Sequence, residues 1–202
     1  MKRIGKSVAA IFVFISLSFS ICGQQLANLG DIGDAYKGGF FRVGAGIAPG
    51  NFGVFSGEEK TNFSITTIHF DFTAGKRLNK SVAPYFNLHG NVLVKETNYF
   101  SSFSESGMSL GSNLYFLNPT TYIAPQIGLS ILNYEENGGN DYRDNLGANF
   151  TLKSGWDRYL GKKVFFGVQL FLTYYFDRNM DDPYAKWNGT FYGVNLSLNL
   201  GK

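Results

Sequence analysis

The sequence has few of the residues that build disulfide frameworks and metal centres. Its 202 residues include one cysteine, Cys22, and two histidines, His69 and His89. A single cysteine excludes a disulfide framework within the chain. As a metal or catalytic pair the two histidines would need an open, oriented site, whereas a packed interior requires of them only a hydrogen-bond partner. We therefore expect no metal, no cofactor and no disulfide.

Long hydrophobic runs are also lacking after the first residues. An apolar run starts at Val8 and continues loosely to Ile21, and no later run is apolar enough for a transmembrane helix. No later segment keeps a helical periodicity either. Only helices and closed barrels can cross a bilayer, because other structures leave backbone groups unpaired in lipid. A membrane-spanning form of this chain must therefore be a β-barrel.

The first residues have the pattern of an export signal. Lys2, Arg3 and Lys6 precede the apolar run, and small residues follow it near Gly23. This pattern predicts a signal peptide over 1–23 and a periplasmic segment over 24–38. Two alternatives are a membrane-anchor helix, for which the run is short, and lipidation at Cys22, for which the preceding residues fit poorly.

Charged residues make up only 16% of the chain, and their apparent excess of positive charge belongs to this leader. Without Lys2, Arg3 and Lys6, the 18 basic residues fall to 15, which equals the 15 acidic residues. Nucleic-acid binding then has no electrostatic support.

What the sequence does contain is a two-residue alternation, clearest from Thr190 to Leu200. Apolar residues there alternate with small or polar ones, as in a strand with one apolar face. The same alternation predicts eight strands, at 39–48, 63–76, 82–95, 106–117, 121–133, 145–159, 163–176 and 190–200.

The connections alternate between short and long. Tight turns are expected at 78–81, 118–120 and 161–162, and longer loops at 49–62, 96–105, 134–144 and 177–189. This layout predicts an all-β fold, an eight-stranded antiparallel up-and-down transmembrane β-barrel, over residues 39–202.

Alternation alone does not say which face points outward, since a secreted lipocalin-like barrel would put its apolar face inside. Abundant glycine on the polar face, low charge and aromatics at strand ends favour the membrane arrangement. The interior would then hold a polar network, with Lys95 on the same face, that consists of Arg42, His69, Asp71, Asn87, His89, Lys153, Asp157, Gln169 and Asn195. Aromatics expected at the membrane interfaces are Phe116, Trp156, Tyr159, Tyr174, Phe176 and Tyr192.

With these strands and loops, the chain resembles the small eight-stranded outer-membrane barrels of the OmpA/OmpX/OmpW type. Its last strand is similar to the β-signal that the outer-membrane assembly machinery recognises, with Tyr192, Gly193, Leu196, Leu198 and Leu200 in the matching places. Many relatives end on Phe, whereas here Gly201 and Lys202 follow Leu200. The resemblance implies the outer membrane of a Gram-negative bacterium, with outer-membrane lipids and the assembly machinery as partners.

The motifs of common enzymes are not found. The glycines at Gly44 and Gly46 lie within a strand pattern and form no phosphate loop, and no serine has the spacing of a nucleophile elbow. The acidic residues near Asp181 lack the spacing of a calcium loop. We therefore expect no enzymatic activity.

An eight-stranded barrel is only wide enough for side chains to fill it. The expected role is structural or surface-interacting, through four extracellular loops that bind an unknown ligand. Charged and aromatic loop residues were expected to provide contact area, namely Phe52, Phe55, Glu58, Glu59, Lys60, Glu135, Glu136, Asp141, Tyr142, Asp181, Asp182, Tyr184 and Trp187. A narrow conduit for small hydrophobic molecules or ions, and a soluble apolar-ligand carrier, are the alternatives.

Overall fold

The fold is a closed antiparallel barrel of eight strands, which confirms the predicted fold class. The computed structural model describes residues 38–56, 59–98, 100–116, 120–136, 141–160, 163–178 and 185–201. The strands are β1 (Gly38–Ser56), β2 (Glu59–Arg77), β3 (Val82–Leu93), β4 (Phe100–Tyr115), β5 (Thr121–Glu136), β6 (Asp141–Tyr159), β7 (Val164–Arg178) and β8 (Ala185–Gly201). The predicted leader and periplasmic segment lie outside the described residues, except for Gly38.

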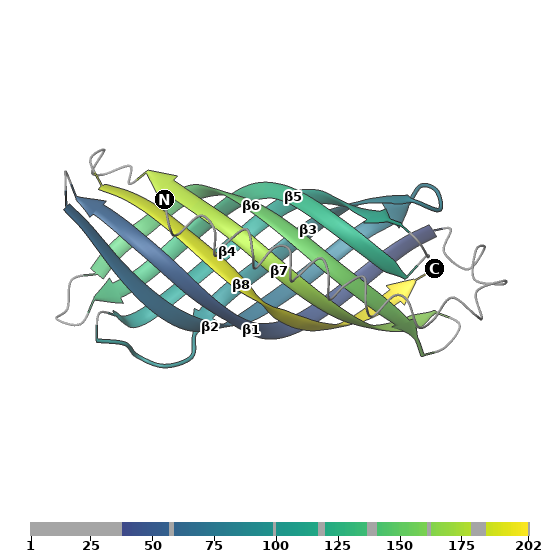
Figure 1. Cartoon of the computed structure of the whole chain (residues 1–202), viewed down its shortest axis with the longest axis horizontal. Coiled ribbons are helices and arrows are strands. Elements are labelled where there is room, and N and C mark those ends of the chain that lie inside the picture. The colour runs from purple at the N-terminus through teal and green to yellow at the C-terminus, as the bar shows by residue number, and fades with distance from the viewer. Residues whose placement is uncertain are drawn as a thin grey trace, which may run out of the picture.

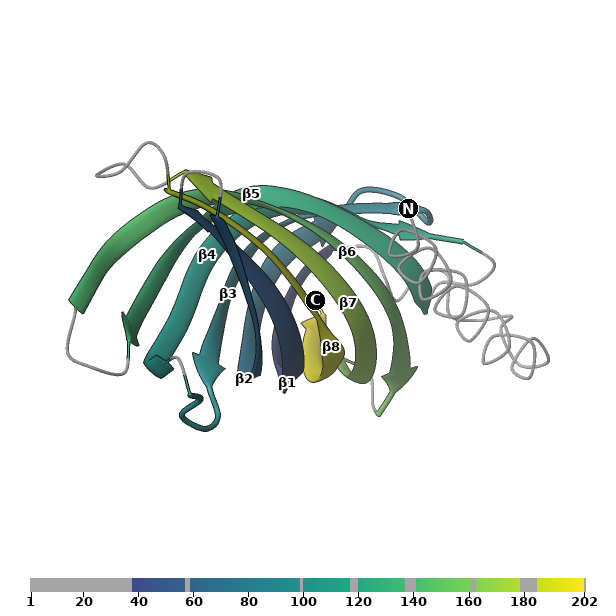
Figure 2. The ribbon, with the colours of Figure 1, turned by 60° about the vertical axis from the view of Figure 1, so that its left-hand side comes forward.

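Each strand pairs with its neighbours in sequence, and β8 closes the barrel against β1 (Figure 1). The strands are strongly tilted and wrap around a long, narrow cylinder (Figures 1 and 2). One end of the barrel holds the short turns, the first residue of β1 (Gly38) and the last residue of β8 (Gly201). We call it the turn end. The other end, where β1 meets β2, is the loop end.

Most strands reach further toward the loop end than their sequence pattern indicated. The loops expected at 49–62, 96–105, 134–144 and 177–189 are largely strand, and β1 and β2 pair as far as Ser56 and Glu59. Pro49 and the glycines of β1 suggested a loop, but the ladder between β1 and β2 continues through them. The expected long loops are therefore corrected to much shorter connections.

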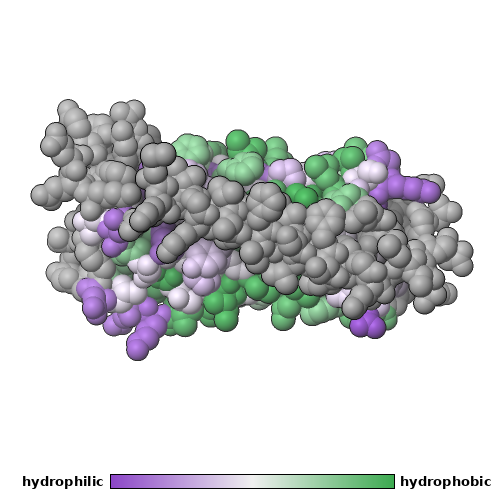
Figure 3. Space-filling model, viewed as in Figure 1, coloured by the Kyte–Doolittle hydropathy of each residue, from purple (hydrophilic) through white to green (hydrophobic). Residues whose placement is uncertain are grey.

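Side chains alternate between the outside and the inside along every strand, as a pleated strand requires. In β8, for example, Val194, Leu196 and Leu198 are exposed, and the residues between them are buried. Exposed apolar side chains of this kind occur on all eight strands and form an apolar band around the barrel. Figure 3 shows this band as green atoms at mid-length, with purple atoms toward both ends.

Beyond the apolar band, toward the loop end, the polarity of the two faces is reversed. Outward positions there hold residues such as Asn51, Ser64 and Thr66, which are exposed. Inward positions hold a buried aromatic cluster, which consists of Ala48, Phe52, Ile65, Phe100, Phe103, Leu132, Tyr134, Phe171, Tyr175, Trp187 and Phe191. The barrel thus has a polar interior within the band and an apolar core beyond it.

The turn between β2 and β3 shows how a predicted hairpin is fixed. The Leu78 amide donates to the Val82 carbonyl at 3.0 Å, and Asn79 Oδ1 accepts from the amides of Ser81 and Val82. Such side-chain acceptors stabilise tight turns. Of the two other predicted turns, residues 118–119 of the first and all of 161–162 lie outside the described residues. Within the described residues, no helix is long and apolar enough to cross a membrane.

Candidate functional site in the barrel interior

All nine residues expected in the interior network lie inside the barrel. None of them is more than 7% exposed, although they come from six different strands. Isolated buried charges are unfavourable, so the arrangement depends on how these side chains are paired.

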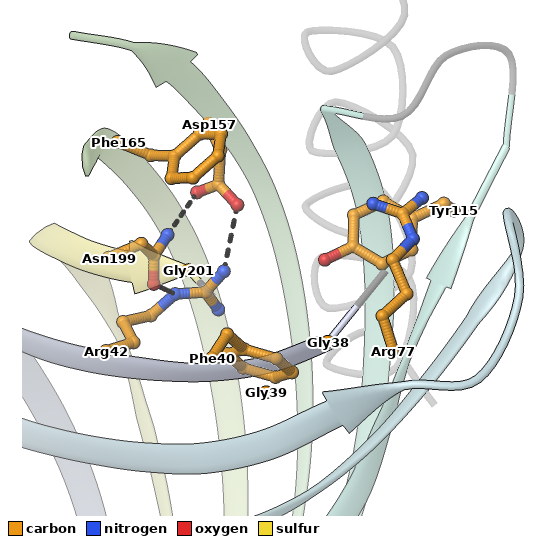
Figure 4. A pocket seen from close by; sticks show the side chains of 10 residues that line it. All are labelled: Gly38, Gly39, Phe40, Arg42, Arg77, Tyr115, Asp157, Phe165, Asn199 and Gly201. Carbon is orange, nitrogen blue, oxygen red and sulfur yellow. Dashed lines mark hydrogen bonds and ion pairs between the residues drawn. The ribbon is translucent and has the colours of Figure 1, made fainter. Parts of the chain in front are cut away.

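The first group lies near the turn end, around Arg42 of β1. Its Nε donates to Asn199 Oδ1 at 2.6 Å and its Nη2 to Asp157 Oδ2 at 2.9 Å, while Asn199 Nδ2 donates to the other oxygen of Asp157 at 3.0 Å (Figure 4). The guanidinium carbon also lies 4.8 Å from the ring centre of Tyr122. The charge of Arg42 is therefore matched by a carboxylate, an amide and an aromatic face.

A small cavity of about 40 Å³ opens beside this group at the turn end. Arg77 lines it across from Arg42, with its guanidinium carbon 3.8 Å from the ring centre of Tyr115 (Figure 4). Arg77 also donates to the carbonyl oxygens of Asn79 and Lys80 in the adjacent turn. It joins the interior to the turn, and its role was not predicted.

The second group surrounds Asp71 of β2, whose carboxylate is fully buried. Lys153 forms an ion pair with Asp71 Oδ2, to which Asn87 Nδ2 also donates at 3.0 Å. Thr73 Oγ1 donates to the other oxygen at 2.9 Å. The two predicted cations thus each meet one of the two predicted carboxylates.

The third group contains a charged residue that sequence analysis missed. Glu105 of β4 is 2% exposed, and it accepts from Asn91 Nδ2 at 2.7 Å and lies 3.1 Å from His89 Nε2. Next to it, His69 Nδ1 lies 3.0 Å from Asn91 Oδ1, and the His69 ring packs on Phe171. Glu105 was placed in a loop because the alternation was followed only from residue 106. The inward series Phe103, Glu105, Ser109 was the signal for it.

Gln169 and Asn195 complete the predicted network between the charged groups. Gln169 Nε2 donates to the Tyr122 hydroxyl at 2.5 Å, and Asn195 Nδ2 donates to Gln169 Oε1 at 3.2 Å. The interior is tight here, because a β-carbon at Gly44 would lie 2.5 Å from Asn195 Nδ2. Glycine on the inner face leaves room for a larger partner from the neighbouring strand.

Two aromatics that were expected in exposed loops belong to the core. Phe52 and Trp187 are each 2% exposed, and both lie in the aromatic cluster. The Phe52 ring lies 4.9 Å from the ring of Phe191, and the Trp187 ring 4.5 Å from that of Tyr134. They point inward because they occupy inward positions of the extended β1 and β8. Their expected role as exposed contact residues was wrong.

Most of the other residues predicted in loops fall outside the described part of the chain. Glu58, Asp181, Asp182 and Tyr184 lie outside the described residues, as do the side chains of Phe55, Glu59, Lys60, Glu136, Asp141 and Tyr142. Glu135 is half-buried on β5. Lys95 was expected on the inner face, but it follows the end of β3 and is exposed on the outside. That expectation is corrected.

The aromatics expected at membrane interfaces mostly lie on the outer face. Tyr174, Phe176 and Tyr192 are exposed toward the loop end, and Phe116 and Trp156 are half-buried toward the turn end. Tyr159 differs, because it shares the inward parity of Asp157 and its ring lies 4.3 Å from that of the inward Phe165. Its expected interfacial place is therefore wrong.

The residues that resemble a β-signal all lie in β8, which pairs with β7 on one side and β1 on the other. Tyr192, Leu196, Leu198 and Leu200 are exposed on the outer face. A β-carbon at Gly193 would overlap the carbonyl oxygen of Ile47, so this position in the closing seam requires glycine. Whether the assembly machinery reads these residues stays a prediction.

The interior groups are arranged for packing. Each of the three buried carboxylates is held by at least two side-chain partners. Among the residues that the structure describes, no three histidine, cysteine, aspartate or glutamate side chains are grouped so that they would hold a metal ion. The arrangement favours a rigid interior.

Comparison with known proteins shows similarity in fold but not in sequence. No protein-family model matches the chain. No curated protein matches it in sequence. Among solved structures it is similar to Neisserial surface protein A, with a TM-score of 0.57, 14% identity, and coverage of 80% of this chain and 97% of that one.

Two further similar structures are more distant. Ail, the attachment invasion locus protein of Yersinia pestis, has a TM-score of 0.49 at 10% identity, covering 80% of this chain and 99% of that one. The outer membrane protein OprG from Pseudomonas aeruginosa has a TM-score of 0.43 at 11% identity, covering 83% of this chain and 98% of that one. Taken with the closed barrel and its apolar outer band, the chain has the fold of the small eight-stranded outer-membrane β-barrels.

Proposed function

We propose that this chain is an integral outer-membrane protein of a Gram-negative bacterium, exported by its predicted leader. The observation that supports this most is the distribution of polarity in the strands. Within the apolar band, Leu196 and Leu198 are 52% and 54% exposed, while Asn195 and Ser197 between them are at most 2% exposed. A soluble barrel would not expose large apolar side chains on all eight strands, whereas a bilayer requires them.

Within that membrane we propose a structural and surface-interaction role, without enzymatic activity. The interior supports this, because the aromatic cluster and the three polar groups place buried side chains along most of its length. A filled eight-stranded barrel offers no wide path for solutes. Such a barrel is a rigid scaffold that presents its connecting segments on the cell surface.

The same arrangement supports a proposed orientation in the membrane. The loop end would face outward and the turn end would face the periplasm, as in other barrels with short periplasmic turns. Outer-membrane lipids would contact the apolar band, the assembly machinery would recognise β8, and an unidentified extracellular ligand would meet the loop end.

The test is fractionation of cells that express the protein, followed by conductance measurements on the purified, refolded protein. We expect it to sediment with outer membranes, to resist carbonate extraction, and to run faster on a gel unheated than heated. Planar bilayers should show no stable conductance steps. Extraction by carbonate would contradict the membrane assignment, and reproducible channel steps would contradict the filled interior and favour a conduit.

A further inference from the structure

A groove on the outer wall lies where the apolar band ends toward the loop end. Its volume is about 400 Å³. The floor is formed by β1 and β2, with Tyr192 of β8 at one side and the segment after β3 at the other. The residues that define it by chemistry are Pro49, Asn51, Ser64, Thr66, Lys95 and Tyr192. All of them lie at outward positions, so the groove faces away from the barrel interior.

The groove results from the short length of β3. Pairing of β2 with β3 stops at Thr67 and Leu93, although β2 continues to Glu59. The chain then leaves the wall after a last bond from the Val94 amide to the Thr66 carbonyl. The teal connection between β3 and β4 lies beside β2 and outside the line of the strands (Figures 1 and 2). It forms a raised side to an otherwise smooth wall.

The opposite side of the groove coincides with an interruption between β1 and β8. Their pairing runs as far as Ile47 with Val194 and resumes at Gly50 with Phe191. Pro49 lies in the interval, and proline has no amide hydrogen to donate. The interruption leaves Tyr192, which is 45% exposed, beside Pro49 at this side of the groove.

The groove lies at the loop-end edge of the apolar band. Directly below it on the same strands are the exposed side chains of Ile47, Ile68 and Val194, which belong to the apolar band. Its floor holds the exposed polar residues Asn51 and Thr66. A lipid lying along Ile47 and Ile68 would therefore place its headgroup in the groove.

The side chains of the groove match an anionic, hydroxyl-rich headgroup. Lys95 supplies an exposed ammonium that can pair with a phosphate, and the amide and hydroxyls of Asn51, Ser64 and Thr66 can bond sugar hydroxyls. The ring of Tyr192 offers a flat surface at the membrane interface. Glu96 also lines the groove, and its negative charge repels an anion. Substitutions of Lys95 and Glu96 should therefore change the binding of an anionic headgroup in opposite directions.

We propose that this groove binds the phosphorylated sugar headgroup of an outer-leaflet lipid. The proposal rests on the proposed membrane location, with the loop end outward. It assigns a specific lipid contact to one sector of the barrel, on β8, β1, β2 and the segment from Val94 to Thr97.

The test uses the full barrel refolded into phosphatidylethanolamine nanodiscs doped with diphosphoryl lipid A or with its dephosphorylated form. Native mass spectrometry after release into mild detergent counts the lipid A molecules retained. We expect retention of the phosphorylated form, and about fivefold weaker retention for Lys95→Ala, the effect of one surface lysine on an anionic lipid. Glu96→Gln should retain more than the wild type.

Lys163→Ala is the matched control, because it removes another exposed lysine, at the turn end, and should leave retention unchanged. Tyr192→Leu keeps the apolar surface and should weaken retention if the ring contacts the sugar. Inorganic phosphate in excess should not displace the lipid, since the groove also contacts its sugar and chains. Displacement would mean a free-phosphate site and would overturn the lipid assignment.

Two other results would also overturn the proposal. Equal losses of retention for Lys95→Ala and Lys163→Ala would mean that the lipid responds only to general surface charge. Equal retention of phosphorylated and dephosphorylated lipid A would mean that the groove does not recognise the phosphate. Gel mobility before and after heating is measured first on every variant. A wild-type barrel that does not insert contradicts the proposed function, whereas one that inserts without selectivity contradicts only the headgroup groove.

Discussion

At the scale of residues, the stability of the interior depends on buried charges that form ion pairs. Arg42 with Asp157 and Lys153 with Asp71 bring together strands that are not neighbours in the wall. These pairs cross the interior, and so connect opposite sides of the barrel. Removing one partner of such a pair leaves an uncompensated charge, which is worse than removing both.

The Lys153 pair gives a direct test of this idea. Lys153→Met leaves the buried Asp71 carboxylate without its cation and should lower the free energy of unfolding by about 3–5 kcal/mol. The double variant Lys153→Met with Asp71→Asn should recover most of that loss. Urea unfolding in lipid vesicles measures both. Equal losses in the single and double variants would show that the ion pair is not what holds these strands.

The outer face is tested by a charge in the apolar band. Leu196→Arg should cost about 2–4 kcal/mol if residue 196 lies near the middle of the bilayer. Ser102→Arg is the control, because Ser102 is also exposed and outward but lies toward the loop end, beyond the band. It should be nearly neutral. If the two substitutions cost the same, the apolar band does not face lipid.

The sequence predicted well which residues point into the barrel interior, and the exceptions have physical reasons. Alternation placed Arg42, Asp71 and Lys153 on the inner face, since parity alone decides this once a strand is recognised. Glu105 was missed and Lys95 misplaced because each lies near a strand end, where the alternation does not show how far pairing continues. Which cation meets which carboxylate depends on contacts across the barrel, and these leave no mark in local sequence.

At the scale of elements, the sequence predicted all eight strands, but it predicted the lengths of most of them wrongly. The expected strands stop where the polarity pattern reverses, as in β1 after Ala48, where Pro49 and Gly50 also suggest a turn. Beyond that point Phe52 is inward and Asn51 outward, which reads as the wrong face for a membrane strand. The reversal is a real feature of the fold, since this part of the barrel has a core and a polar outer surface.

The aromatic cluster should therefore contribute to stability as a core does. Trp187→Ala and Phe103→Ala should each lower the free energy of unfolding by about 3–5 kcal/mol, because each empties a buried aromatic site. Tyr174→Ala, on an exposed ring of the outer face, should cost less. Thermal unfolding in micelles compares the three. A neutral Trp187→Ala would return this residue to an exposed binding role.

The connections should differ in what their loss does. Shortening the segment 137–140 or 179–184 should leave gel mobility and membrane yield intact while weakening any surface binding, because the described pairing ends at Glu135 with Asp141 and at Arg178 with Lys186. Shortening the turn at 78–81 should impair folding, because Asn79 and Arg77 fix that hairpin. Equal loss of folding in all three shortened variants would mean that the two loop-end connections are also needed for folding.

At the scale of the whole molecule, one barrel carries two opposite patterns along its axis. Its turn-end and middle parts are polar inside and apolar outside, as a bilayer requires. Its loop-end part has a buried aromatic core and polar outward residues, like a soluble barrel. The boundary between them fixes the depth of the barrel in the membrane and passes through the headgroup groove. A rigid closed barrel held at a fixed depth in the membrane is suited to presenting its loop end at the cell surface.

The most direct test of this account is a nitroxide scan along β8 of the refolded barrel in lipid vesicles, from Asn188 to Leu200. Labels at Val194, Leu196 and Leu198 should be relaxed by dissolved oxygen, which concentrates in lipid, and those at Asn195 and Ser197 should not. At Asn188 and Thr190, outward but beyond the band, a water-soluble nickel complex should be the stronger relaxant. Oxygen accessibility at Asn195 and Ser197 in place of their neighbours, or no alternation at all, would contradict the barrel described here.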